Sequence, residues 1–159
     1  MTSVVNTDTL AEAPEQLAPP SRILIVDDYE PWRRVVSWLL NGLPEWEIVG
    51  EAADGLEAVQ KAQELQPALT LLDIGLPMFN GIEAACKIHI VAPNTKILFV
   101  SVNVCPELVQ GALSSGAEGY VAKSDAANEL LPAMRSVMNG QRFVGQRFTE
   151  YNLLPPEHN

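Results

Sequence analysis

Leu69–Gly81 reads Leu-Thr-Leu-Leu-Asp-Ile-Gly-Leu-Pro-Met-Phe-Asn-Gly, and the fold can be predicted outward from this stretch. A run of apolar and β-branched residues stops abruptly at a single acid, Asp73. Pro77 and the pair Asn80-Gly81 then indicate a turn before a helical pattern begins. A buried strand that ends in an acid presents that acid at the rim of a sheet. We therefore take Asp73 as the candidate reactive group.

Four other short stretches have the composition of strands. Ile23–Val26 and Ile97–Val100 are continuous apolar runs, which are typical of strands covered on both faces. Glu47–Ala53 is predicted to be a more exposed strand, and Glu118–Lys123 a short one. Polar residues end these stretches: Asp27 and Asp28 follow the first, Ser101 follows the run that begins at Ile97, and Lys123 ends the last.

Apolar residues at helical spacing separate the strands, and they predict helices near residues 31–40, 56–65, 82–91, 108–113 and 127–138. Pro31 suits the first turn of a helix. Asp54 is expected to cap the second helix, and Ser124 or Asp125 the last one. Strand and helix therefore alternate five times along the chain.

This alternation predicts an α/β fold, a doubly wound parallel sheet with helices on both faces and right-handed crossovers. In such a sheet the ligand site lies outside the carboxyl ends of the strands, where the direction of winding changes. The polar residues that end the strands should all meet on this rim; they are Asp27, Asp28, Asp73, Ser101 and Lys123.

The composition excludes several classes of protein. The 159 residues are 47% hydrophobic with a formal net charge of −10, which indicates one globular domain without the basic face of a nucleic-acid-binding protein. The sequence has no signal-peptide pattern and no apolar stretch of about 20 residues, so we expect a cytoplasmic protein without membrane contact. Residues 1–20 predict a flexible arm. Cys86 and Cys105 lack metal-ligand spacing and are expected to be buried thiols.

The residues on the predicted rim suit phosphoryl transfer. Three carboxylates held together repel one another unless a cation neutralises them. A hard divalent ion such as Mg²⁺ (or Mn²⁺) is the natural partner for their oxygens. Lys123 and Ser101 could contact two phosphate oxygens. Asp73 in this setting is a workable nucleophile toward phosphorus, which would give an aspartyl phosphate.

Together these residues resemble the receiver domain of two-component response regulators. Asp27-Asp28 is similar to the acidic pair of that family, Asp73 to its phosphoacceptor, and Asp73-x-x-x-Pro77-x-x-x-Gly81 to the loop that follows. Ser101, Tyr120 and Lys123 match the switch hydroxyl, the switch aromatic and the lysine. The resemblance covers roughly residues 21–141, which we take as the domain, with residues 142–159 as a C-terminal tail.

The resemblance has definite implications. The fold would be flavodoxin-like, (βα)5, with strand order 2-1-3-4-5. The phosphodonor would be a bacterial sensor histidine kinase or a phosphotransfer protein. Mg²⁺ would be bound by Asp28, Asp73 and the backbone carbonyl of Gly75, with Asp27 acting through water. No external substrate would be turned over, so the protein would not be an enzyme beyond its own phosphorylation and slow dephosphorylation.

The sequence departs from the family at two positions. Ser124 follows Lys123 where many receivers have proline, so a cis peptide is not expected there. Gly75 has no side chain to orient or shield the water that attacks a phosphoaspartate. We therefore predict that substitutions at Gly75 or Asn103 change the autodephosphorylation rate.

The sequences of several stretches are similar to those of receiver domains that precede a helix-turn-helix DNA-binding domain. Only 19 residues follow Gly140, too few for such a domain. We favour a stand-alone receiver that does not bind nucleic acid directly and acts through a partner or through self-association as a homodimer. The alternative is a fragment of a longer DNA-binding transcriptional regulator. The tail repeats Gln-Arg-Phe at 141–143 and 146–148, which leaves open whether it docks on its own domain or on a partner.

Three rival interpretations are weaker. A phosphohydrolase with an Asp nucleophile often has a second Asp two residues later, where this chain has Gly75. A passive scaffold would not need the full set of rim residues. A flavin-binding protein would need a Ser/Thr/Gly-rich phosphate loop after the first strand. The tryptophans at 32, 38 and 46 are expected to serve packing and not a ligand site.

Overall fold

The computed structural model describes residues 18–151 and 153, so most of the arm expected at 1–20 lies outside the described residues. The elements in chain order are β1 (Ser21–Val26), α2 (Glu30–Leu40), β2 (Trp46–Ala52), α3 (Gly55–Leu65), β3 (Leu69–Leu72), α4 (Gly81–Val91), β4 (Lys96–Ser101), α5 (Pro106–Ser114), β5 (Gly119–Ala122), the 3₁₀ turn η1 (Lys123–Asp125), α6 (Ala126–Met138), β6 (Phe143–Val144) and the 3₁₀ segment η2 (Gln146–Tyr151). The five predicted strands and five predicted helices are all present.

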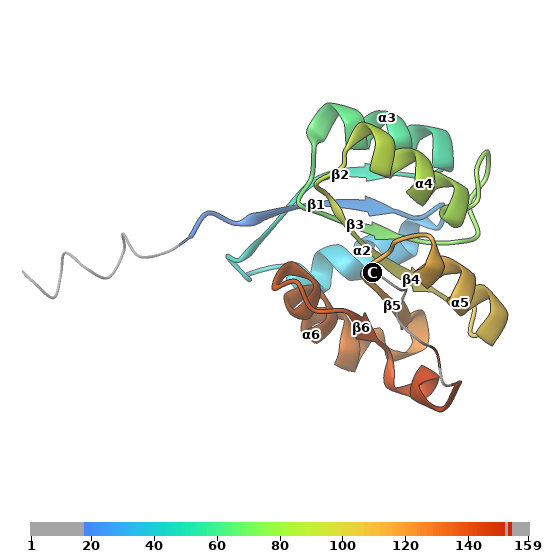
Figure 1. The fold of residues 1–159 in the computed structure, drawn as a ribbon. Helices are drawn as coiled ribbons and strands as arrows, with labels where there is room; N and C mark the ends of the chain where they lie inside the picture. Colours follow the sequence, from blue (N-terminus) through green and yellow to red (C-terminus); the bar gives the residue numbers. More distant parts are fainter. Residues whose placement is uncertain (1–17, 152, 154–159) are drawn as a thin grey trace, which may run out of the picture.

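The strands form one sheet in the order β2-β1-β3-β4-β5-β6, and every neighbouring pair is parallel (Figure 1). The predicted order 2-1-3-4-5 is confirmed, and a sixth strand extends it. In the register, Val26 lies beside Leu72, and Leu72 lies beside Phe99. The last residues of the central strands therefore end at one level, and the residues that follow them meet on the same rim.

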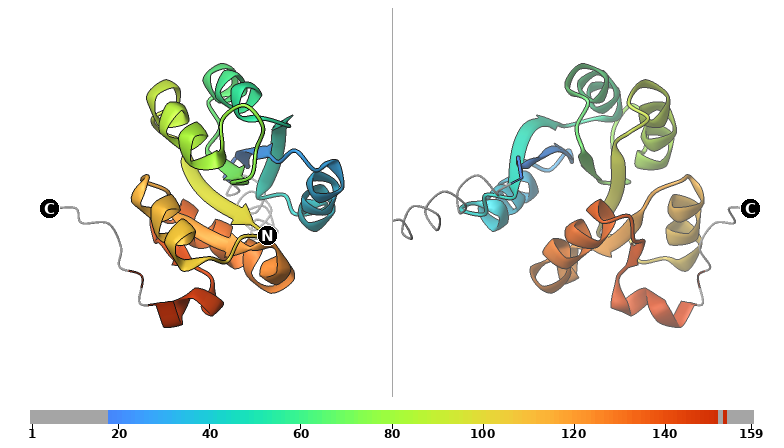
Figure 2. Two further views of the ribbon diagram at one scale, coloured as in Figure 1. Left: turned by 90° about the vertical axis from the view of Figure 1, so that its right-hand side faces the viewer. Right: turned by 60° about the vertical axis from the view of Figure 1, so that its left-hand side comes forward.

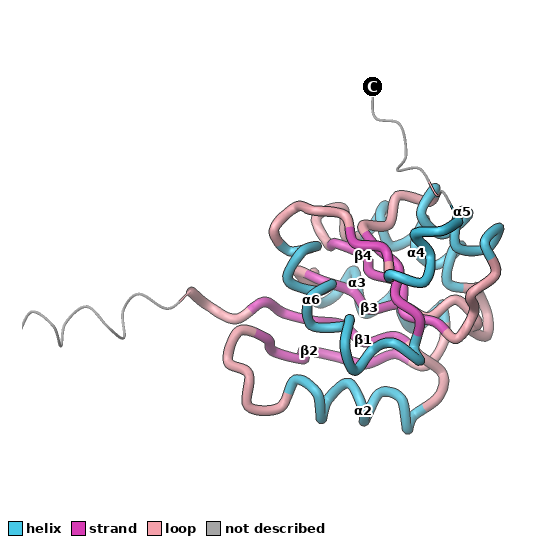
Figure 3. The backbone as a smooth tube through the Cα atoms, turned by 90° about the horizontal axis from the view of Figure 1, so that it is seen from below, coloured by secondary structure: helices cyan, strands magenta, loops and turns pink. Residues whose placement is uncertain are grey.

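Helices cover both faces of the sheet. Apolar side chains of α2 and α6 pack on one face, and those of α3, α4 and α5 on the other (Figures 1 and 3). Successive residues of β1 serve the two faces in turn, because Leu24 and Val26 belong to one cluster and Ile23 and Ile25 to the other. This double coverage is why the predicted strands are continuous apolar runs.

Two helices begin at the side-chain caps that their sequences favour. Asp54 Oδ1 accepts a hydrogen bond from Glu57 N at 2.7 Å, as predicted. Asn80 Oδ1 accepts one from Glu83 N at 2.9 Å. Of the two candidates predicted to cap α6, Asp125 occupies the N-cap position, but its side chain makes no capping hydrogen bond within the described part of the chain, and the turn η1 leads into α6. The Asp125 carboxylate instead accepts hydrogen bonds from the guanidinium of Arg147.

The loop after β3 explains the Gly81 of the predicted motif. Gly81 N donates to Ile74 O at 2.7 Å, which brings the start of α4 against the backbone that directly follows β3. A Cβ on Gly81 would collide with the carbonyl oxygen of Asp73. Gly55 N donates to Pro77 O at 3.0 Å and fixes the other side of the loop to α3. A glycine is therefore required where α4 begins, because two backbones touch there.

Part of the tail is docked on the domain, which the sequence left open. Phe143 N donates to Glu118 O at 3.1 Å, and Gly145 N donates to Tyr120 O at 2.9 Å. These bonds make β6 a short strand along β5, and η2 follows it at the same edge of the sheet (Figure 2).

Two smaller expectations can also be compared with the structure. Cys86 and Cys105 are exposed, so the prediction of buried thiols is wrong. Cys86 lies on the outer side of the surface helix α4, and Cys105 lies directly before α5. Among the residues that the structure describes, no helix is both long enough and apolar enough to cross a bilayer.

Candidate phosphoacceptor site

Four parallel strands deliver their terminal polar residues to one rim. Asp27 follows β1, Asp73 follows β3, Ser101 ends β4 and Lys123 follows β5. Backbone hydrogen bonds continue the sheet under the two acids, since Asp27 N donates to Ala52 O and Asp73 N to Val26 O, both at 3.0 Å. The rigid sheet therefore fixes both carboxylates.

The three acids predicted as metal ligands lie close together. One carboxylate oxygen of each of Asp27, Asp28 and Asp73 lies within 4.8 Å of the others. Asp27 and Asp73 are buried, at 1% and 7% exposed, whereas Asp28 faces solvent. The cluster is thus open on one side, and Tyr29 N orients Asp27 by donating to its Oδ1 at 2.9 Å.

Lys123 is the cation of this cluster. Its Nζ lies 2.6 Å from Asp27 Oδ2 and 3.9 Å from Asp73 Oδ2. The contact with Asp27 is a short ion pair, and that buried oxygen has no other partner among the described residues. The indole of Trp32 lies under the same ammonium, 5.2 Å from ring centroid to Nζ. Lys123 therefore lies between the two buried acids and an aromatic face.

The environment raises the pKa of Asp73 above the ordinary value of an aspartate. Burial is the largest cause, and the neighbouring Asp27 carboxylate is the second. Lys123, the Ile74 backbone N–H and the Ser101 hydroxyl oppose this shift. A raised pKa makes the carboxylate more basic than usual; the main cause is the loss of solvation on burial, and the negative charge of Asp27 adds to it.

The donor set fits a divalent cation. One lysine faces three carboxylates, so the described site carries an excess of negative charge with oxygen donors only. Hard cations such as Mg²⁺ prefer oxygen donors of this kind. The acidic cluster could therefore hold a metal ion, as the sequence predicted. Gly75 lies two residues beyond Asp73 and is exposed, with no described atom within 4 Å of the place where its Cβ would be.

Ser101 and Tyr120 are linked through the loop after β4. Asn103 N donates to Ser101 Oγ at 3.1 Å, and Tyr120 Oη donates to Asn103 O at 2.8 Å. Tyr120 is fully buried and points inward from β5. Burial is the main cause that raises the pKa of Tyr120 to about 12, so the hydroxyl stays protonated and remains a donor. The predicted switch residues are thus connected within one hydrogen-bonded chain.

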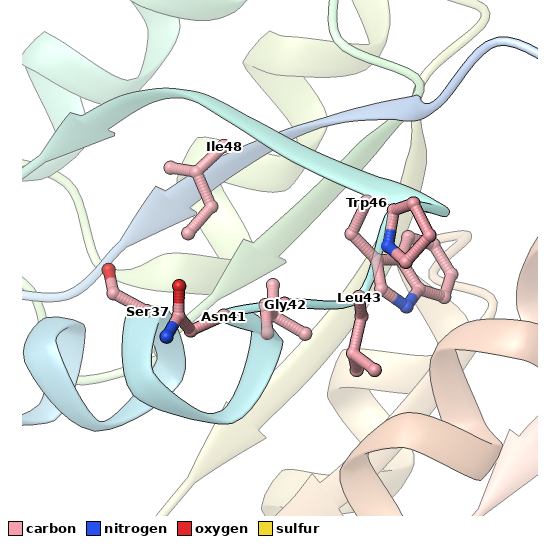
Figure 4. Close-up of a pocket in the computed structure, with 8 residues that line it drawn as sticks. Ser37, Asn41, Gly42, Leu43, Trp46 and Ile48 are labelled. Atoms are coloured by element: carbon pink, nitrogen blue, oxygen red, sulfur yellow. The ribbon is translucent and has the colours of Figure 1, made fainter.

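A hollow of about 520 Å³ lies elsewhere, at the opposite end of the sheet from the acidic cluster. The end of α2 and the start of β2 line it, including Ser37, Asn41, Trp46 and Ile48 (Figure 4). The described residues around it include no acid and no base. The acidic rim is the place where charged groups converge.

Comparisons with known proteins agree with this geometry. A family model of the response regulator receiver domain matches residues 23–135, which is well over half of the chain. The chain belongs to this family. The predicted flavodoxin-like fold and the predicted family are both confirmed.

Relatives and solved structures extend the match. The chain is 34% identical to the response regulator GacA of Pseudomonas protegens over 131 residues, which are 81% of this chain and 61% of GacA. It is 36% identical to the oxygen regulatory protein NreC of Staphylococcus epidermidis over 129 residues, 80% of this chain and 59% of NreC. The chain therefore spans about three fifths of the length of these curated relatives.

Two crystal structures share the fold at useful identity. A two-component response regulator of the LuxR family from Aurantimonas superimposes with a TM-score of 0.78 at 30% identity, covering 82% of this chain and 94% of the other. The response regulator domain of Thermotoga maritima CheB gives a TM-score of 0.70 at 35% identity, covering 76% and 97%.

Sequence reasoning missed two features of the site. Trp32 packs against the core as predicted, but its ring also faces Lys123, which the sequence did not indicate. Phe148 of the tail was given no role, yet its ring lies 5.3 Å from that of Tyr120 between centroids. The repeated Gln-Arg-Phe in the tail was the one available signal for the second contact.

Proposed function

We propose that this chain is a phosphorylation-activated receiver in which Asp73 accepts a phosphoryl group from a phosphohistidine of a sensor histidine kinase or phosphotransfer protein. The observation that carries the proposal is the Asp73 carboxylate at the end of β3, buried beside Asp27 and 3.9 Å from the Lys123 ammonium. Membership of the receiver family supports it.

In the proposed step an Asp73 carboxylate oxygen attacks phosphorus and the P–N bond of the donor breaks. The bonding electrons return to the ring nitrogen, and a proton on the other ring nitrogen makes the leaving imidazole neutral. The Asp73 carboxylate is the nucleophile of this step, and the covalent product is an aspartyl phosphate. Phosphoryl transfer then needs little more than in-line positioning and charge neutralisation.

The other rim residues have complementary roles in this scheme. Asp28, Asp73 and the carbonyl of Gly75 would hold Mg²⁺ or Mn²⁺, with Asp27 acting through water. The bound ion would supply positive charge to the phosphoryl oxygens. Lys123, 3.9 Å from Asp73, would move toward one phosphoryl oxygen. Ser101 would donate its hydroxyl to another, which draws the loop of Asn103 inward and retains Tyr120 in its buried position.

The proposed activity is switching and not turnover of an external substrate. Gly75 leaves the position two residues after Asp73 without an acid, so a phosphohydrolase mechanism lacks its second carboxylate. Output would be through a change in partner binding or self-association. The stand-alone organisation and the cytoplasmic location expected from the sequence stay predictions, since the chain spans only part of the length of its relatives.

The test is uptake of labile phosphate. The full chain is incubated with acetyl phosphate and Mg²⁺ and its intact mass is measured, with Asp73→Asn as the matched control because asparagine keeps the shape and loses the nucleophile. We expect one phosphate on the wild type, none on the variant, and none on the wild type when the divalent ion is chelated. A wild type that gains no phosphate would make a passive scaffold the better interpretation.

A further inference from the structure

Residues 143–151, called the C-terminal segment from here on, are held tightly for a short extension at the edge of a sheet. Phe148 is 0% exposed, although the segment around it is largely at the surface. Phe148 N donates to Gly145 O at 2.9 Å, and Gly145 N in turn donates to Tyr120 O at 2.9 Å. The backbone thus carries the Phe148 side chain directly to β5.

The first contact of the segment with the switch is aromatic. The rings of Phe148 and Tyr120 meet edge to face, with centroids 5.3 Å apart and an interplanar angle of 86°. Tyr151 lies on the other side of Phe148, 5.7 Å between centroids. Edge-to-face pairs of this kind are a favoured geometry. Because Phe148 packs on the inward ring of Tyr120, the pair depends on the position of that ring.

The second contact is ionic and lies directly after Lys123. Arg147 Nε and Nη2 donate to the two carboxylate oxygens of Asp125 at 2.6 and 3.0 Å, and Nη2 also donates to Ser124 Oγ at 3.1 Å. A two-pronged contact of this type fixes orientation as well as distance. Gln146 N adds a bond to Glu129 Oε2 at 3.0 Å on α6.

Both contacts lead back to the acidic cluster by short routes. From Phe148 the route runs through Tyr120, whose hydroxyl donates to Asn103 O, and then through Asn103 N to Ser101 Oγ. From Arg147 it runs through the η1 turn, which begins with Lys123 itself. The two groups expected to move toward a phosphoryl group on Asp73 are therefore each connected to the C-terminal segment.

We propose that the C-terminal segment is an internal ligand of the switch face formed by β5 and the start of α6, and that phosphorylation of Asp73 strengthens its binding. This inference rests on the proposed function. Phosphorylation would hold Ser101 and Lys123 toward the phosphate and Tyr120 inward. In this arrangement Phe148 packs on Tyr120, and Arg147 binds Asp125. Linkage then makes the effect reciprocal, so a bound segment also favours the phosphorylated state. A partner that adds a strand to β5 would have to displace the segment.

The test is hydrogen exchange on the full chain, read by mass spectrometry with and without acetyl phosphate and Mg²⁺, with intact mass measured in parallel. We expect the amides of Gly145 and Phe148 to exchange at least about fivefold more slowly after phosphorylation, the lower end of common coupling factors. Asp73→Asn should show no such change. If the wild type gains phosphate mass while exchange in 143–151 is unchanged, the coupling is wrong and the proposed function stands.

Two variants separate the contacts. Phe148→Ala should take up phosphate but show no slowing of exchange at the Gly145 amide on phosphorylation. Arg147→Ala should show a smaller slowing than the wild type. The matched controls are Trp38→Ala and Arg34→Ala, an exposed aromatic residue and an exposed arginine on α2, which should both retain the full slowing. If both tail variants retain it as well, the inference is overturned. A wild type without any phosphate mass would remove the proposed function and this coupling together.

Discussion

Leu72 and Asp73 are neighbours in the chain and belong to opposite kinds of environment. Leu72 is fully buried between apolar side chains of β1, β4 and the helices that cover them. Asp73, one residue later, lies beside a second buried acid with one lysine shared between them. Apolar side chains in the sheet interior are surrounded by other apolar side chains, whereas the rim has more negative charge from its carboxylates than Lys123 neutralises.

This difference indicates how the molecule separates stability from reactivity. Burial of each large apolar side chain contributes about 1.5–3 kcal/mol to folding. Carboxylates that repel one another in a poorly solvated place work in the other direction. The free energy gained in the interior therefore offsets the repulsion between the carboxylates of the rim. A cation or a phosphoryl group that binds there relieves this repulsion.

The largest expected effect lies on the interior side of the comparison. Leu72→Ala should lower the free energy of unfolding by about 2–5 kcal/mol, because loss of this fully buried side chain leaves a cavity under the layer of α3, α4 and α5. Urea unfolding followed by circular dichroism measures it. Ile90→Ala is the control, since Ile90 is 79% exposed on α4 and should change stability by less than about 0.5 kcal/mol. Equal effects at both positions would contradict the assignment of the interior.

The next effect concerns the rim and a bound cation. Mg²⁺ should raise the free energy of unfolding, by about 2.7 kcal/mol at a concentration one hundred times its dissociation constant. Asp28→Asn should shift the required concentration upward, because it removes the most accessible of the three carboxylates. Thermal or urea unfolding across a Mg²⁺ titration measures both. A wild type whose stability ignores Mg²⁺ up to high millimolar concentration would argue against the metal site.

A smaller effect follows from the raised pKa of Asp73. The folded protein holds the Asp73 proton to higher pH than the unfolded chain does, so stability without divalent ions should fall as pH rises from the ordinary aspartate range through the raised pKa. Above that range the full cost of the ionised carboxylate is present. Asp73→Asn should remove this component and be more stable than the wild type at neutral pH. Unfolding curves of both proteins from pH 4 to 8 would show it, and parallel pH profiles would contradict it.

The smallest effect is expected from substitutions near the acceptor that change only the lifetime of the phosphoryl group on Asp73. Gly75→Asn should fit without strain, because its backbone is not in the left-handed region and no described atom crowds the new Cβ. An amide that orients the attacking water should speed loss of the phosphoryl group by about fivefold, the rate equivalent of one hydrogen bond of about 1 kcal/mol. Asn103→Ala should slow that loss by a similar factor. Decay of the phosphorylated mass measures both, and equal lifetimes in all three proteins would sink the idea.

The same comparison separates what could be read from the sequence. The acceptor and its lysine could be predicted, because continuous apolar runs identify buried parallel strands and the residues that end them must share a rim. The Gly81 of the loop could be predicted too, although its reason, the contact with the Asp73 carbonyl, needed coordinates. These features depend on local pattern and on the rules of one sheet.

The features that escaped prediction depend on contacts between distant segments. Trp32 and Lys123 are far apart in the chain, and they meet only because the Lys123 side chain reaches along the rim to Asp27, close to the first turn of α2. Strand β6 has two residues, too few for a period, and its pairing is decided by the open edge of β5. Asp125 looked like a helix cap, but Arg147, supplied by the tail, offers it a charged partner. Side chains with several good partners cannot be assigned from local sequence alone.

The central claim is that Asp73, and no other acid of the cluster, carries the phosphoryl group. Borohydride reduces an acyl phosphate to the alcohol, releasing inorganic phosphate and converting that aspartate to homoserine. Protein treated with acetyl phosphate and Mg²⁺ is reduced, digested and sequenced by tandem mass spectrometry. We expect homoserine at position 73 alone, and none without the phosphodonor. Homoserine at position 27 or 28, or at no position in protein that has gained phosphate mass, would contradict the assignment.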